Sequence, residues 1–220
     1  MENPWKEISK EHPYAKCDET IIYAEKYKNR LQIDYGSLPE PYIGNLKSNI
    51  LCLNGNPGPN QYNLEILDIL LKELQKTLTH NSHHFMWLSK ELEATNHWGV
   101  NWWKKMTKSL FDELGFSPQL FVLEYFLYHS KKMFNFPKLP SDTYRNYLLK
   151  QAMDAGKLIV VMRAESRWYH IKEDGIGKRL KEYQHKIILR NPRRVYLSRN
   201  NMGEDNWKKF IETLKQSDKY

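Results

Sequence analysis

Short apolar runs alternate along the chain with stretches of helical periodicity. The run 49–54 (Asn-Ile-Leu-Cys-Leu-Asn) is too short for a buried helix and is bounded by turn residues, which predicts a buried strand. The apolar positions that follow, from Leu64 to Leu74, recur with helical spacing. This part of the chain therefore predicts a strand, a tight loop and a helix in succession.

The same alternation continues to the end of the chain. Further apolar runs predict strands at 119–125, 157–162 and 194–197. Periodicity predicts helices at 20–31, 64–79, 103–114, 141–153, 178–184 and 206–214. Strands that alternate with helices favour a parallel sheet covered on both faces. No linker divides the 220 residues, so we expect one three-layer α/β/α domain, 1–220, with a mainly parallel four-stranded sheet and a helical lead-in at 1–47.

Composition narrows the class of protein. A net charge of +8 suits a polyanionic partner, and some of the 14 Tyr, 8 Phe and 7 Trp could stack on bases, although most belong in the core. Cys17 and Cys52 are far apart, and Cys52 lies in a buried strand, so neither a structural disulfide nor an iron–sulfur cluster is expected. The histidines at 80–84 suit a solvated helix end better than a metal site. We expect no metal and no other cofactor.

The expected location follows from hydropathy. No apolar run reaches membrane-spanning length, and the first residues lack the charged-then-apolar order of a secretion signal. We therefore expect a soluble, intracellular, cytoplasmic protein that is a monomer and has no membrane partner.

The loop 55–59, which follows the first predicted strand, is the strongest candidate for a functional site. Gly55 and Gly58 let a ligand approach the backbone, while Pro57 and Pro59 fix two φ angles and so hold the side chain of Asn56. Ligands bind at this position, between a strand's carboxyl end and a helix's amino end, in open α/β sheets. The glycine spacing excludes a dinucleotide fingerprint, and the lack of a Lys-Ser/Thr pair excludes a P-loop. A turn without function is the alternative.

Three segments, in this order, resemble motifs of the uracil-DNA glycosylase superfamily, and most of all its single-strand-selective monofunctional and mismatch-specific branches. Residues 55–59 resemble the first motif, in which the Asn holds the attacking water, and 160–167 resemble a later strand and turn. Residues 197–200, followed by Asn206 and Trp207, resemble the second motif, whose loop enters the minor groove. The resemblance implies a uracil-glycosylase-like fold and a monofunctional DNA glycosylase that acts on a flipped base.

The chain departs from the family pattern in two places. Val195 or Tyr196 stands where the family has a His that stabilises the departing base, and Glu124 stands where an Asn reads uracil. Because an ionised Glu only accepts hydrogen bonds, we expect a base that carries an amino group rather than plain uracil. Two alternatives stay open for Glu124: burial keeps it neutral and restores uracil recognition, or it has a structural role, as a helix cap or as the partner of Arg163 or Lys132.

The loop, the strand ends and the resemblance together define the candidate residues. The catalytic candidates are Asn56, Glu124 and His129, where His129 either replaces the missing imidazole or is a surface residue. The expected substrate-binding residues are Gly55, Pro57, Gly58, Tyr62 and Tyr125. The expected contacts to single- or double-stranded DNA are Lys131, Lys132, Arg163, Ser198, Arg199 and Asn200. The rival hypotheses are a catalytically silent relative that binds nucleic acid or a nucleotide, and a protein-interaction role for the aromatic region 85–103.

Overall fold

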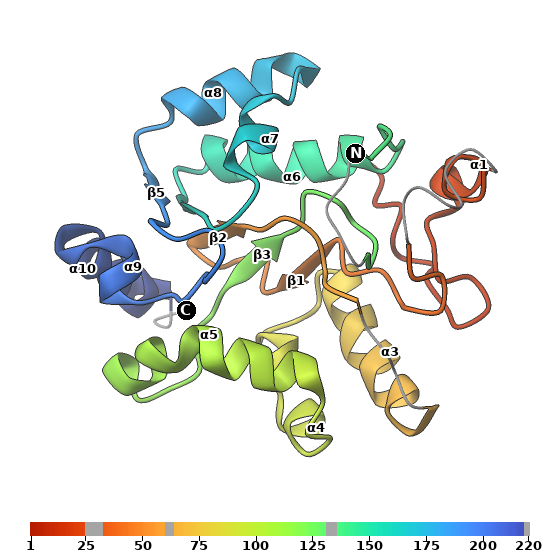
Figure 1. Cartoon of the computed structure of the whole chain (residues 1–220), viewed down its shortest axis with the longest axis horizontal. Coiled ribbons are helices and arrows are strands. Elements are labelled where there is room, and N and C mark those ends of the chain that lie inside the picture. The colour runs from red at the N-terminus through yellow and green to blue at the C-terminus, as the bar shows by residue number, and fades with distance from the viewer. Residues whose placement is uncertain (25–32, 60–63, 131–135, 218–220) are drawn as a thin grey trace.

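A five-stranded sheet forms the centre of the computed structural model, which describes residues 1–24, 33–59, 64–130 and 136–217 (Figure 1). The strand order is β1-β3-β2-β4-β5. The strands are β1 (Tyr42–Gly44), β2 (Ile50–Leu53), β3 (Phe121–Leu123), β4 (Leu158–Val161) and β5 (Lys186–Ile188). β3, β2, β4 and β5 pair in parallel, whereas β1 lies antiparallel to β3 at one edge.

Helices connect the strands and cover the sheet. The longer ones are α3 (Leu64–Leu78), α5 (Trp98–Leu114), α6 (Asp142–Asp154) and α10 (Glu204–Ser217). The shorter ones are α1 (Glu19–Ile22), α4 (Lys90–Glu93), α7 (Glu165–Tyr169), α8 (Ile176–Glu182) and α9 (Arg199–Met202), with 3-10 turns η1 (Lys16–Asp18), η2 (Met86–Leu88) and η3 (Glu173–Gly175). Figure 1 shows α6, α7 and α8 on one side of the sheet and α3, α4 and α5 on the other. In the part of the chain that is described, no helix has the length and apolar character needed to cross a membrane.

The α/β class expected from the sequence is confirmed, but the prediction of four strands is wrong. Tyr42–Gly44 adds an antiparallel strand, with Tyr42 opposite Leu123. Gly44 makes this edge compact: its φ is 98°, and a Cβ there would lie 2.0 Å from the carbonyl oxygen of Leu120. The turn signals at Pro39 and Pro41 predict a loop here, but the loop ends directly before the strand.

The last parallel strand is Lys186–Ile188, so the prediction of a strand at 194–197 is also wrong. Residues 194–197 pack on α5, where Leu197 N–H donates to the carbonyl oxygen of Met106 at 2.9 Å. Val195 and Leu197 are fully buried, so the run has the alternation of a strand although it pairs with none of the sheet strands. An alternating apolar pattern thus shows that one side of a segment is buried, but it does not show that the segment belongs to a sheet.

Most of the predicted helices are confirmed within a few residues, namely those at 64–79, 141–153, 178–184 and 206–214. The helix predicted at 103–114 begins earlier, at Trp98, because His97 caps it: Nδ1 of His97 accepts a hydrogen bond from Gly99 N–H at 3.1 Å. Ser141 does not cap α6 through its side chain, since its hydroxyl donates to Asp18 instead. Of the helix predicted at 20–31, Glu19–Ile22 is helical, and residues 25–31 lie outside the described residues.

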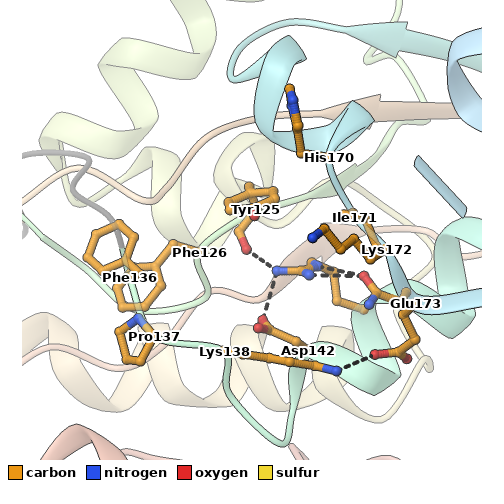
Figure 2. A pocket seen from close by; sticks show the side chains of 12 residues that line it. Tyr125, Phe126, Phe136, Pro137, Lys138, Asp142, His170, Ile171, Lys172 and Glu173 are labelled. Carbon is orange, nitrogen blue, oxygen red and sulfur yellow. Dashed lines mark hydrogen bonds and ion pairs between the residues drawn. The ribbon is translucent and has the colours of Figure 1, made fainter. Parts of the chain in front are cut away.

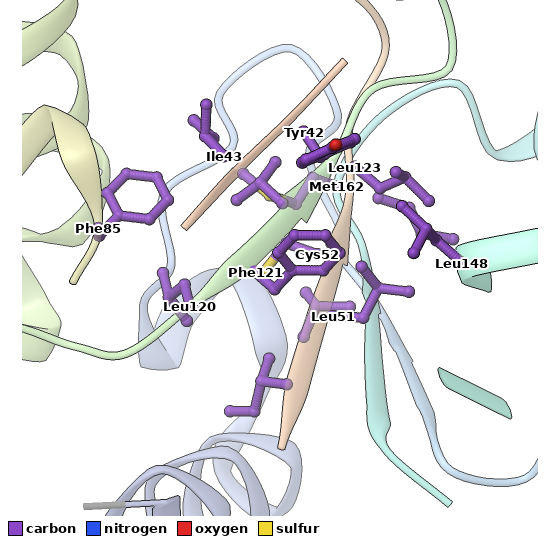
Figure 3. Close-up of a cluster of buried hydrophobic side chains, with 14 of the residues drawn as sticks. Tyr42, Ile43, Leu51, Cys52, Phe85, Leu120, Phe121, Leu123, Leu148 and Met162 are labelled. Atoms are coloured by element: carbon purple, nitrogen blue, oxygen red, sulfur yellow. The ribbon is translucent and has the colours of Figure 1, made fainter. Parts of the chain in front are cut away.

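The core lies on both faces of β2, the central strand. All four of its side chains, Ile50 to Leu53, are fully buried. Figure 3 shows Leu51 and Cys52 among side chains from β1, β3 and the helical segments, with Phe121 close by. Burial raises the pKa of the Cys52 thiol to about 12, which makes it an inert core residue. Because β2 is paired on both sides and packed on both faces, the residues at its carboxyl end have fixed positions.

Candidate functional site

Polar residues follow the carboxyl ends of three neighbouring parallel strands. Asn54 follows β2, Glu124 follows β3, and Arg163 lies two residues beyond β4. Because these strands are parallel, the three residues reach the same edge of the sheet. They line one cavity of about 90 Å³. Its apolar wall consists mainly of four indoles, those of Trp87, Trp98, Trp102 and Trp103.

Asn54 and Glu124 form a buried pair in this cavity, and each is only 4% exposed. Asn54 Nδ2 donates to Glu124 Oε1 at 2.8 Å. The other oxygens, Asn54 Oδ1 and Glu124 Oε2, are buried and have no hydrogen-bond partner among the described residues. Buried polar atoms without partners are costly and rare. Two of them, on two hydrogen-bonded residues that line one cavity, are what a ligand with matching polar groups would satisfy.

Burial raises the pKa of Glu124 to about 8. The hydrogen bond from Asn54 opposes this shift, the charge of Glu40 adds to it, and the charge of Arg163 opposes it. At pH 7 the neutral acid then outweighs the carboxylate by about ten to one. A neutral Glu124 that accepts from Asn54 at Oε1 carries its proton on Oε2, so it can donate. The burial of Glu124 favours the alternative in which its side chain is neutral over the one in which an ionised Glu124 accepts from an amino group of the base. The identity of the base stays a prediction.

The side chain of Asn56 is held in one orientation. Its Nδ2 donates to the carbonyl oxygens of Pro57, at 2.9 Å, and Ser130, at 3.1 Å, and lies 2.9 Å from Ser130 Oγ. Carbonyl oxygens only accept, so this end of the side chain is the NH2 group. The amide oxygen receives no hydrogen bond from the described residues. Asn56 lines the cavity, so it can offer this oxygen to a hydrogen-bond donor there, such as a water.

His129 also lines the cavity, and it is not the surface residue that was the alternative, because it is 2% exposed. Its Nδ1 lies 2.5 Å from the carbonyl oxygen of Gly58 and therefore carries a hydrogen. Its Nε2 lies 3.3 Å from Glu40 Oε1, and the other oxygen of Glu40 accepts from Trp87 Nε1 at 3.1 Å. The ring thus holds the loop at Gly58 through Nδ1. The contact of Nε2 with Glu40 Oε1 is an ion pair only when the ring is protonated, because Oε1 has no hydrogen-bond partner among the described residues.

Arg163 brings a positive charge to the cavity. Its guanidinium carbon lies 5.8 Å from the ring centre of Trp102. Burial lowers the pKa of Arg163, and the charge of Glu124 opposes that shift. Its Nε atom is buried and bonds to no residue that the structure describes. The pairing of Glu124 with Arg163, which the sequence left open, is not a direct ion pair within the described ranges. The two side chains instead line the same cavity.

The structure separates Tyr125 from this cavity. Tyr125 lines a second cavity of about 270 Å³, shown in Figure 2, on the side of the sheet that α6 covers. Its carbonyl oxygen accepts from Arg145, whose guanidinium carbon lies 4.7 Å from the Tyr125 ring centre. Arg145 also pairs with Asp142 at 2.7 Å, and Lys138 pairs with Glu173 at 3.0 Å. None of the described residues around this cavity has a buried polar side-chain atom without a partner, so the smaller cavity is the better candidate.

The remaining predicted residues do not join the cavity. Ser198, Arg199 and Asn200 line a separate hollow beside the end of α5, which shares no lining residue with the first cavity. Arg199 lies 3.6 Å from a carboxylate oxygen of Glu113 and 3.5 Å from one of Glu204. The predicted contacts of these three residues to DNA stay predictions. Tyr62, Lys131 and Lys132 lie outside the described residues.

Three residues of the site were not among the candidates from the sequence. Asn54 and Glu40 line the cavity, and Ser130 accepts a hydrogen bond from the side chain of Asn56. Asn54 ends the predicted strand 49–54, so the rule that singled out Glu124 applies to it equally. Glu40 lies in an expected loop, and no sequence pattern marks it. Gly55, which was expected to bind substrate, is not among the residues that line the cavity. Its carbonyl oxygen accepts from Phe126 N–H at 2.9 Å and ties the loop to the segment that leads to His129.

Comparison of the chain with protein-family models, with curated proteins and with solved structures finds no match. The chemistry of the cavity is therefore the basis for a functional proposal.

Proposed function

We propose that the protein binds nucleic acid and hydrolyses the N-glycosidic bond of a base that is flipped out of the strand. The observation that carries this proposal is one cavity that contains both an oriented amide oxygen, on Asn56, and a buried pair of polar groups without partners, on Asn54 and Glu124. The first suits a water and the second suits the edge of a base.

The reaction needs a water near the sugar carbon and stabilisation of a cationic sugar and an anionic departing base. Asn56 Oδ1 accepts a hydrogen bond from the water and so directs its lone pair toward the sugar. Arg163 and the neutral Glu124 offer positive charge and a hydrogen to the departing base. Val195 or Tyr196 stands where the uracil-DNA glycosylase superfamily has a His that stabilises the departing base. A hydrogen-bond donor of this kind contributes about 100- to 1000-fold in rate. We therefore expect slow turnover.

The cavity also suggests which base is bound. Asn54 Oδ1 accepts from a ring N–H, and the neutral Glu124 donates to a neighbouring carbonyl oxygen, which suits an imide edge such as that of uracil. The cavity of about 90 Å³ is smaller than the engineered cavity of about 150 Å³ that holds benzene, so a two-ring base is excluded and even a one-ring base requires the cavity to widen. A base with an amino group, as predicted from the sequence, fits the ionised form of Glu124 instead, which dominates only above pH 8 or so.

The arrangement of the parallel strands supports the proposal. Four parallel strands lie in the order β3-β2-β4-β5, and the loop with Asn56 follows the central strand β2. This arrangement places the loop where ligands bind in open α/β sheets.

A catalytically silent relative remains the second candidate, and the contacts of His129 favour it. Nδ1 of the ring contacts the carbonyl oxygen of Gly58 and Nε2 contacts Glu40, so the ring is poorly placed to assist a departing base. The deciding experiment uses single- and double-stranded oligonucleotides that each hold one modified base, followed by alkali to cleave abasic sites. Cleavage of any member supports hydrolysis. Binding without cleavage of every member supports the silent relative.

A further inference from the structure

The loop that follows β5 carries three exposed arginines within five residues, Arg190, Arg193 and Arg194. Pairing between β4 and β5 extends one residue into this loop, because Leu189 N–H donates to the carbonyl oxygen of Val161 at 3.0 Å. Neighbouring strands lie about 4.8 Å apart. The loop therefore starts one strand away from the segment with Arg163, at the same edge of the sheet as the candidate cavity.

Two asparagine side chains fix the backbone of this loop. Asn191 Oδ1 accepts from the N–H groups of Arg193, at 3.0 Å, and Arg194, at 3.1 Å. Asn201, which is 7% exposed, donates to the carbonyl oxygen of Arg194 at 2.9 Å and accepts from Asn191 N–H at 2.8 Å. The loop is thus held from both ends, so the two arginines start from a fixed backbone and lose less freedom when they bind.

Arg190 has a different role from the other two arginines. Its Nη1 donates to the carbonyl oxygen of Asn200 at 3.4 Å. The guanidinium also lies close to the backbone of Gly203, since a Cβ there would be 2.5 Å from Nη2 of Arg190. Arg190 therefore anchors the loop to the start of the last helical segment.

The guanidinium groups of Arg193 and Arg194 make no hydrogen bond and no ion pair with any residue in the described ranges. Arg199, only five residues beyond Arg194, differs because it lies near Glu113 and Glu204. Two neighbouring carboxylates offset the charge of Arg199 and would repel a phosphate, whereas nothing comparable offsets Arg193 and Arg194. A guanidinium presents a planar fork of N–H groups that matches a phosphate.

We propose that the loop 190–194 binds the phosphate backbone of a nucleic acid strand beside the cavity, through Arg193 and Arg194. The choice of nucleic acid among polyanions rests on the proposed function, since the strand has to deliver a base to the cavity. The phosphate contacts thus lie at the carboxyl end of β5, and not at Arg199.

The test is the salt dependence of binding, measured by fluorescence anisotropy with labelled single-stranded and duplex oligonucleotides. Each lost phosphate contact lowers the slope of log affinity against log salt by about 0.7 for a single strand and 0.9 for a duplex. Changing Arg193→Ala and Arg194→Ala together should lower the slope by about 1.4 and 1.8. Arg199→Ala tests the rival assignment from the sequence, in which Arg199 contacts the phosphates, and under the loop assignment it should leave the slope unchanged. Arg193→Lys with Arg194→Lys keeps the charges and should retain most of the slope.

A native slope in the double alanine variant, an equal loss in Arg199→Ala, or no binding by the native protein at low salt would each overturn the loop assignment. Thermal unfolding shows whether the variants are folded. Base excision is measured separately with the modified-base oligonucleotides. If the double variant loses the slope but no oligonucleotide is cleaved, the loop assignment stands and the glycosylase fails. If the native protein cleaves and the double variant keeps its slope, the reverse holds.

Discussion

Glu124→Gln should make the protein more stable at neutral pH, and by an amount that grows with pH. In the unfolded chain Glu124 loses its proton near pH 4.5, whereas in the folded protein burial raises its pKa to about 8. Between these values the unfolded state binds fewer protons than the folded state, so the free energy of unfolding falls as pH rises. At about 1.4 kcal/mol per pH unit, the loss is roughly 3 kcal/mol at pH 7 and roughly 4 kcal/mol at pH 8, where the folded protein begins to ionise as well.

Glutamine has the shape of the protonated acid and carries no titrating proton. Its oxygen can accept from Asn54 Nδ2 as Glu124 Oε1 does, and its NH2 group takes the place of the acid O–H. The variant should therefore match the native protein near pH 4.5 and exceed its stability by about 3 kcal/mol at pH 7. The polar groups that act on this position are Asn54, Glu40 and Arg163, and all three are retained.

The assay is urea unfolding of both proteins at pH 5, 6, 7 and 8, with the difference in free energy taken at each pH. Other groups whose pKa shifts on folding, such as His80, contribute to both proteins and cancel in the difference. Glu182→Gln, at an exposed position on α8, is the control and should show no trend. The reasoning is refuted if the difference for Glu124→Gln is as flat between pH 5 and 8 as that for the control.

The other predictions concern catalysis and the sheet edge. Asn56→Ala should slow excision of any cleaved base by more than about tenfold, or 1.4 kcal/mol, in single-turnover assays, and a smaller effect would exclude the role in holding water. Uracil excision by the native protein should decline above a pH of about 8 as Glu124 ionises, while Glu124→Gln should show no such decline in the same pH series. Gly44→Ala should lower the free energy of unfolding in urea by about 2 to 5 kcal/mol, because φ of Gly44 is 98° and the new Cβ meets the carbonyl oxygen of Leu120. A decrease of less than about 1 kcal/mol would show that the edge strand adapts.

The three inner strands could be predicted because they are buried on both faces. β2, β3 and β4 are short apolar runs with turn residues at their ends, and this pattern is typical of a central parallel strand. The edge strands lack it. In Lys186–Ile188 only the middle residue is buried, and three residues are too few for a visible alternation. Tyr42–Gly44 is fully buried but starts directly after the proline signals of a loop.

The cavity was predictable only as far as it depends on strand ends. Asn56, Glu124 and Arg163 could be located because each follows an apolar run that forms an inner strand. Glu40 and the tryptophans enter the cavity from loops and from the start of α5, and their positions depend on how those segments pack. The members of the aromatic region 85–103 divide, since Trp87 and Trp103 are buried, while Trp98 is 40% exposed.

The position of the last strand decides which arginines belong to the functional edge. With a strand at 194–197, the loop at the sheet edge would begin at Ser198, and Arg199 would be the arginine beside the flipped base. With the strand at Lys186–Ile188, that edge is instead occupied by Arg190 and the two arginines after it. The ion pairs agree with this shift, because Arg199 lies near two carboxylates and the arginines after Arg190 have none among the described residues. Charge that is left without a partner at the carboxyl end of a parallel strand is better evidence for a phosphate contact than likeness to a short motif.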